Sequence, residues 1–154
     1  MTEAHQAAEG RATTVKKVFS RRTSVAIDIG ASPDVVWKLL TNADGYSKWN
    51  STIVELAGNI DRGGRIRLRS KLAPSREFKL KVKQFEPPHV LSWGDAMGTR
   101  VFRLSPSARG GTRFSMSEVI GGPLFPLFAR MIPQFDESFN QFAADLKAAA
   151  ERGR

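Results

Sequence analysis

One acidic and one basic residue of this sequence are placed to meet on the inner face of a sheet. The segments 99–106 and 111–120 alternate like strands and flank the turn segment SARGG, so we expect them to form an antiparallel hairpin. Paired outward from that turn, the two strands bring Arg100 opposite Glu118. Because Glu118 shares its strand parity with Met116, both charges are expected to point toward the apolar side of the sheet.

Three roles are open for this pair. It can be an ion pair that fixes the register of the strands, since buried charges are normally paired. It can orient the polar end of a ligand in an apolar pocket, or Glu118 can be a catalytic carboxylate. Catalysis needs a second group in reach, and neither His5 in the N-terminal tail nor His89 in a turn is placed to help. Binding is therefore favoured over enzymatic activity, which stays open.

The composition limits other chemistry. The chain has no cysteine, which excludes disulfides, thiolate nucleophiles and cysteine-based metal sites. No other recognisable metal-ligand or catalytic set is present, so neither a metal site nor a cofactor is predicted.

Inward-facing apolar residues surround the predicted ion pair. The hairpin register that pairs Arg100 with Glu118 also places Phe102 opposite Met116. Phe78 faces inward on the segment 76–85, and Trp93 shares a face with Leu91 in a short strand. These side chains either fill a core or form one wall of a cavity.

A stripe of large apolar residues near the C-terminus supplies the opposite side. From Leu124 to Leu146 these residues fall on one face of a helix, but Pro133 is expected to kink or interrupt it. We expect a cavity of several hundred Å³ between the inner sheet face and the helix around Met131 and Phe135. The alternative is plain amphipathic packing. The candidate ligand-binding residues are Trp49, Phe78, Trp93, Arg100, Phe102, Met116, Glu118, Phe128, Met131 and Phe135.

The segment 31–50 carries two of the three tryptophans. Ser32, Pro33 and Asp34 are suited to the beginning of a helix, as an N-cap, a first helical residue and an acid at the positive end of the dipole. Trp37 lies on the apolar sweep of this helix and is expected in the core. Trp49 follows the helix, where it can either belong to the core or gate the cavity mouth.

The size of the chain suits one domain. Its 154 residues include 41% hydrophobic and 25% charged residues, as in a soluble globular protein. Residues 1–13 are expected to form a flexible tail and residues 14–152 a single domain. No apolar run has the length of a signal peptide core or a membrane span, so the cytoplasm is the expected compartment.

The charge is strongly basic, at a formal +9. Basic residues alternate on the outer side of two predicted strands, Arg65 to Lys71 and Lys79 to Lys83, with Arg103 and Arg113 nearby. This face either is simply solvated and resists aggregation, or meets an anionic membrane surface. No aromatic residue alternates with these charges, so nucleic acid is not expected as a partner.

The order of elements is a strand, a short helix, a series of strands and a long final helix. The predicted strands are residues 23–29, 52–58, 64–72, 76–85, 89–94, 99–106 and 111–120, and the uninterrupted part of the final helix is 134–150. Several short strands with regular turn signals indicate one antiparallel meander, with the apolar helix laid across its concave face.

The chain resembles the START-like (SRPBCC) superfamily, and more narrowly its polyketide cyclase/dehydrase and lipid transport type. The resemblance lies in ASPDVVWKLLTNADGYSKWN (31–50), GRIRL after a double glycine, VLSWG, GGTRFSMSEVIGGPL (110–124) and the final helix. It differs at Ser51, where many relatives have proline. The resemblance implies an α+β helix-grip fold, with a seven-stranded antiparallel sheet around a long C-terminal helix and two short helices between strands one and two.

The resemblance also implies a cavity for an apolar ligand, but no common reaction. Three functions follow as hypotheses. The chain binds or transports a small hydrophobic, lipid-like or polyketide-like ligand. Alternatively, it is a cyclase/aromatase-type enzyme, or an adaptor that meets an anionic membrane through its basic sheet face. It is expected to act as a monomer or a homodimer.

Overall fold

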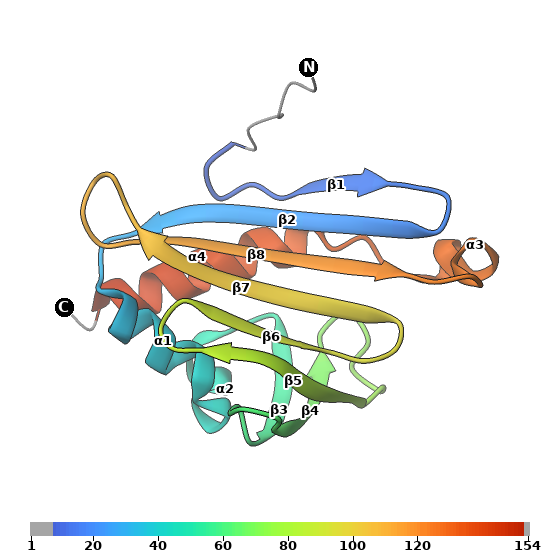
Figure 1. The fold of residues 1–154 in the computed structure, drawn as a ribbon, viewed down its shortest axis with the longest axis horizontal. Helices are drawn as coiled ribbons and strands as arrows, with labels where there is room; N and C mark the ends of the chain where they lie inside the picture. Colours follow the sequence, from blue (N-terminus) through green and yellow to red (C-terminus); the bar gives the residue numbers. More distant parts are fainter. Residues whose placement is uncertain (1–7, 153–154) are drawn as a thin grey trace.

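A single antiparallel sheet forms the framework of the molecule (Figure 1). The computed structural model describes residues 8–152. The sheet has eight strands in the order β1-β2-β8-β7-β6-β5-β4-β3. The strands are β1 (Thr13–Lys16), β2 (Ser20–Ile29), β3 (Ile53–Gly58), β4 (Arg65–Ser70), β5 (Phe78–Glu86), β6 (Val90–Gly94), β7 (Gly98–Pro106) and β8 (Thr112–Gly121).

The helices connect and cover this sheet. Between β2 and β3 lie α1 (Pro33–Thr41), the 3₁₀ turn η1 (Ala43–Gly45) and α2 (Tyr46–Trp49). After β8 come α3 (Phe125–Phe128), the 3₁₀ turn η2 (Ala129–Met131) and the long α4 (Asp136–Arg152). The predicted α+β helix-grip arrangement is confirmed, with the two short helices where they were expected.

The sheet has one strand more than the seven predicted. The additional strand is β1, which pairs with β2 from Thr13 opposite Ser24 to Lys16 opposite Arg21. Its four residues are half-buried or exposed, and they lack the apolar alternation that marks the other strands.

Part of the predicted N-terminal tail lies along β2. Residues 1–7 are outside the described residues, but the backbone N–H of Gly10 donates to the carbonyl of Ala26 (2.8 Å). The Glu9 carboxylate accepts from Arg113 (2.6 Å) and from the backbone N–H of Asp28 (2.7 Å). Arg113 also hydrogen-bonds Asp28 and thereby holds the pKa of that carboxyl below its usual value.

Helix α1 forms as its sequence predicts. The hydroxyl of Ser32 accepts from the backbone N–H of Val35 (3.4 Å), and Pro33 occupies the first turn. Its buried residues include Trp37, which is 8% exposed and packs against Phe85, so the assignment of Trp37 to the core is confirmed.

Helix α4 provides the main cover of the sheet and packs against β2 and α1 (Figure 1). Phe142 lies at the centre of its buried side, 1% exposed, with its ring 5.7 Å from Phe102 and 6.4 Å from Phe114. The Tyr46 ring lies 6.4 Å from that of Phe142, and the Tyr46 hydroxyl donates to the carbonyl of Leu40 (2.7 Å). Burial raises the pKa of that phenol.

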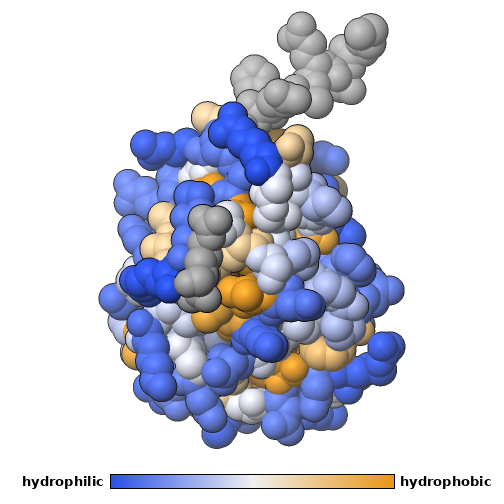
Figure 2. Space-filling view, turned by 90° about the vertical axis from the view of Figure 1, so that its left-hand side faces the viewer, coloured by the Kyte–Doolittle hydropathy of each residue, from blue (hydrophilic) through white to orange (hydrophobic). Residues whose placement is uncertain are grey.

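The apolar residues that precede α4 do not pack against the sheet as those of α4 do. The helix is interrupted at Pro133, as predicted, and α4 begins only at Asp136. Upstream of the break Leu124 is 62% exposed and Met131 82% exposed, so this part of the stripe leaves the core. The opposite end of the molecule, seen in Figure 2, presents mostly hydrophilic side chains. Within residues 8–152, no helix is long and apolar enough to cross a membrane.

Candidate functional site

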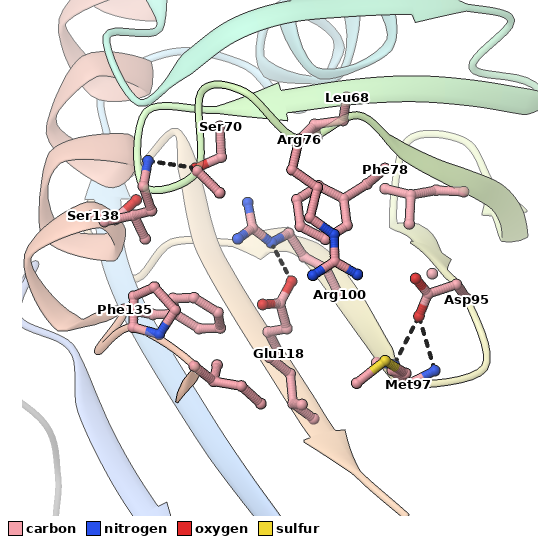
Figure 3. A pocket seen from close by; sticks show the side chains of 18 of the residues that line it. Leu68, Ser70, Arg76, Phe78, Asp95, Met97, Arg100, Glu118, Phe135 and Ser138 are labelled. Atoms are coloured by element: carbon pink, nitrogen blue, oxygen red, sulfur yellow. Dashed lines mark hydrogen bonds and ion pairs between the residues drawn. The ribbon is translucent and has the colours of Figure 1, made fainter. Parts of the chain in front are cut away.

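A cavity of about 380 Å³ opens between the concave face of the sheet and the chain that leads into α4 (Figure 3). Its wall combines parts of β3 to β8, the β4–β5 loop, the β6–β7 turn and residues 131–138. Apolar side chains predominate, among them Ile53, Leu68, Leu72, Phe78, Leu80, Trp93, Met97, Ile120, Met131, Ile132 and Phe135.

The predicted ion pair lies in this wall. Arg100 and Glu118 are opposite each other in the β7–β8 register, as predicted, and Arg100 Nε donates to Glu118 Oε1 at 3.0 Å. Their side chains are 15% and 17% exposed. The Arg100 guanidinium also lies over the ring of Phe139, 4.9 Å from its centroid. The pair is therefore a polar spot in an otherwise apolar wall, held by a neighbouring strand and by α4.

A second arginine lies at the mouth of the cavity. The guanidinium of Arg76, in the β4–β5 loop, is 4.7 Å from the ring centroid of Phe78. Across the mouth, Asp95 Oδ1 accepts from the backbone N–H groups of Met97 (2.8 Å) and Gly98 (3.0 Å), which closes the β6–β7 turn. Figure 3 shows Arg76 and Asp95 on the same side of the cavity as Phe78, with Phe135 on the other.

A third arginine holds the segment before α4 in place. Arg21 on β2 is 5% exposed and donates to the carbonyls of Ile132 (3.3 Å) and Pro133 (2.7 Å). Its guanidinium lies 5.0 Å from the centroid of the Phe135 ring. Burial lowers the pKa of Arg21, while the nearby acids Glu118 and Asp136 act in the opposite direction. Arg21 thus fixes the backbone at the helix break that forms one side of the cavity.

Six of the ten candidate ligand-binding residues line the cavity. They are Phe78, Trp93, Arg100, Glu118, Met131 and Phe135.

The other four candidates lie elsewhere. Phe102 and Met116 face inward as predicted but are 0% and 1% exposed, so they belong to the core, where the Phe102 ring lies 5.7 Å from that of Phe142. Phe128 packs on Phe125 with ring centroids 6.1 Å apart. Trp49 packs against Phe142 at 5.7 Å, and its buried indole N–H has no partner among the described residues.

Sequence reasoning missed several lining residues. Ile120 has the strand parity of Glu118, so alternation alone could have identified it. Ser138 lies in the first turn of α4, and Arg76 and Leu72 come from the β4–β5 loop. Leu72 and Arg76 have the inward-facing parity of the predicted strands 64–72 and 76–85, so alternation could have identified them as well, whereas no strand period bears on Ser138.

The basic sheet face is present on β4 and β5. Arg65 lies opposite Lys81 and Arg67 opposite Lys79, and all four residues are exposed. Like charges directly opposite each other destabilise a sheet.

We therefore expect Lys79→Glu to raise the free energy of unfolding by about 0.5 kcal/mol, since it replaces repulsion of Arg67 by attraction. Lys79→Gln should fall between the wild type and the glutamate variant, because it removes the repulsion only. Urea unfolding at low salt measures the free energies of unfolding of the three proteins, and added salt should reduce the differences between them. A glutamate variant less stable than the wild type would contradict repulsion at this position.

Within the described part of the chain, no three His, Cys, Asp or Glu side chains are grouped so that they could hold a metal ion. The cavity offers hydrophobic contact and a few hydrogen-bonding groups instead.

The architecture has counterparts among known proteins. The family model "Polyketide cyclase / dehydrase and lipid transport" matches residues 20–151. The chain belongs to this family. The family match covers every strand from β2 to β8 and nearly all of α4, and so includes the whole cavity wall. No curated protein matches the sequence of this chain.

Solved structures with the same fold are distant in sequence. A protein from Rhodobacter sphaeroides is similar with a TM-score of 0.67 at 18% identity, over 92% of this chain and 99% of that one. A START superfamily protein from Mycobacterium smegmatis has a TM-score of 0.64 at 14% identity, over 86% and 99% of the two chains. The di-domain ARO/CYC protein BexL of the BE-7585A biosynthetic pathway has a TM-score of 0.67 at 14% identity, over 88% of this chain and 52% of that one. These likenesses show the START-like fold alone.

Proposed function

We propose that this member of the family binds a small, largely apolar molecule in the cavity beside α4. The observation that carries the proposal is the cavity itself, about 380 Å³ with a predominantly apolar wall and one half-buried ion pair. Ligand sites are typically apolar hollows of about 300–1,000 Å³ in which a few placed polar groups fix the orientation. Membership in a family described by lipid transport supports the same reading.

We expect Arg100 to orient the bound molecule by donating hydrogen bonds to its polar end. Among the described residues it makes one hydrogen bond, through Nε to Glu118. A guanidinium has several further N–H donors, and Figure 3 shows this group directed into the cavity. An oxygen of the ligand, such as a carbonyl, hydroxyl or carboxylate, can accept from it while the apolar body lies against Phe78 and Trp93.

Binding or transport is favoured over a cyclase-type reaction by the state of the cavity's acids. Of the described lining residues, only Asp95 and Glu118 are carboxylates. Asp95 closes the β6–β7 turn and Glu118 pairs with Arg100. Both carboxylates are therefore already engaged, one in closing a turn and the other in pairing two strands.

Filling the cavity should abolish binding. Ser138 lines it from the first turn of α4, so Ser138→Trp is expected to place an indole in the space that the ligand needs. We expect the affinity for a fluorescent fatty acid, cis-parinaric acid, to fall about tenfold or more, which corresponds to about 1.4 kcal/mol. A fluorescence titration measures the change.

The matched control is Ala148→Trp on the exposed side of the same helix. It adds a larger side chain to α4 without entering the cavity, and it should bind the probe like the wild type. Equal affinities of the wild type and Ser138→Trp, with both proteins folded, would place the binding site elsewhere and refute the proposal.

A further inference from the structure

We infer that one end of the molecule docks on an anionic lipid bilayer. The surface concerned, called here the docking tip, consists of Val18, Phe19, Leu124, Leu127 and Met131. The first two residues lie in the β1–β2 hairpin and the others between β8 and α4. This surface is distinct from the basic face of β4 and β5, and the inference does not depend on which ligand the cavity takes.

The docking tip exposes several large apolar side chains together, which is unfavourable in water. Val18 is 71% exposed, Phe19 58%, Leu124 62%, Leu127 80% and Met131 82%. These are the five highest exposures among the large hydrophobic residues described as exposed. Clusters of this kind mark an interaction surface.

The two segments of the docking tip are neighbours in space. The backbone N–H of Gly122 donates to the carbonyl of Phe19 at 3.0 Å. Figure 1 shows the β1–β2 hairpin beside α3 at the same end of the molecule. The opposite end, in Figure 2, presents mostly hydrophilic side chains around apolar ones near its centre.

The charge around the docking tip identifies the kind of surface that it fits. Residues 13–22 and 119–135 together contain five lysines and arginines and no acid. Of these cations Arg21 is buried, whereas Lys16, Lys17, Arg22 and Arg130 are exposed. Apolar side chains that enter a bilayer, flanked by cations that meet anionic headgroups, are the pattern of an interfacial anchor.

A second copy of the chain fits the docking tip less well. In a symmetric dimer the same patch faces itself. The exposed cations of the two copies would then approach each other, with no acid from either segment between them. An anionic bilayer satisfies both the apolar and the charged part of the surface.

The docking tip is continuous with the mouth of the cavity. Met131 belongs to the docking tip and also lines the cavity. The backbone N–H of Gly121 donates to the carbonyl of Met97 (3.0 Å), whose side chain lines the mouth and is 41% exposed. Docking would therefore bring the cavity mouth to the bilayer, where an apolar molecule can pass between them without crossing water.

The test is sedimentation of the full chain with vesicles of phosphatidylcholine containing about 30 mol% phosphatidylserine, and with phosphatidylcholine alone. We expect the wild type to bind the anionic vesicles. The affinity of the variant Val18→Asp/Leu127→Asp for these vesicles should be lower by about tenfold or more. Val18→Ser/Leu127→Ser, which leaves the charge unchanged, should also bind more weakly because the apolar contact is lost.

The matched control is Lys79→Gln/Lys81→Gln on the basic sheet face, which lowers the net charge by two, as the double aspartate variant does. It should retain most of the binding. Loss of binding in this control with full binding of the aspartate variant would assign the interaction to the sheet face and overturn the inference. The inference would also be overturned if the wild type did not bind anionic vesicles. The same holds if analytical ultracentrifugation showed that the wild type is a dimer and that the aspartate variant is a monomer.

Discussion

Phe142→Ala is expected to lower the free energy of unfolding by about 3–5 kcal/mol, the range for phenylalanine truncations in a core. Phe142 is 1% exposed and its ring lies between the rings of Phe102 and Phe114 on the sheet and that of Trp49 on α2. The edge-on contact with Trp49, at 88° between the planes, adds to the loss of buried area. Urea unfolding followed by circular dichroism measures the effect.

The size of this effect depends on whether α4 and the sheet can close over the missing ring. Helix α4 is held beside the cavity by Arg21 at its start, and the surrounding rings come from three different elements, so little collapse is expected. Phe142→Leu, which keeps most of the volume, should cost less than about 1.5 kcal/mol. A loss below about 1 kcal/mol for the alanine variant would mean that Phe142 is not the centre of the core.

Glu118→Gln is expected to lower the free energy of unfolding by about 2–3 kcal/mol. It leaves the Arg100 guanidinium charged and only 15% exposed, facing the Phe139 ring with a neutral amide in place of a carboxylate. Breaking a fully buried pair costs about 3–5 kcal/mol, and the remaining exposure of both side chains should reduce that cost. Thermal and urea unfolding give the change directly.

The double variant Arg100→Met/Glu118→Leu separates pairing from packing. It removes both charges while keeping apolar volume, so its stability should lie closer to the wild type than that of Glu118→Gln. In the same proteins, affinity for cis-parinaric acid should fall in the double variant, because the ligand loses the donors of Arg100. If Glu118→Gln matched the wild type in both stability and affinity, the pair would have no role in either.

Much of the fold followed from strand alternation. The register of the last hairpin could be predicted because SARGG is an unambiguous turn, and a two-residue period then fixes every opposite pair, including Arg100 with Glu118. Strand β1 could not be found in this way. Thr13–Lys16 is too short and too polar to show a period, and it is defined by its pairing with β2.

The cavity could be predicted only in part, because parity tells which face a residue points to but not what lies above it. Phe102 and Met116 point to the concave face, yet the Phe142 ring covers that part of the sheet and makes it core. Two positions further from the β7–β8 turn, Arg100 and Glu118 lie beyond this ring and border the cavity. The difference arises from where α4 begins, which depends on Pro133 and Arg21 together.

Native mass spectrometry of the chain purified without denaturation tests the central claim most directly. The account predicts an additional mass from a small apolar molecule on the wild-type protein, or its appearance after incubation with cis-parinaric acid. The same mass should be retained by Ala148→Trp and lost from Ser138→Trp. A wild type that carries no such molecule and takes up no fatty acid, while remaining folded, would contradict a ligand-binding cavity.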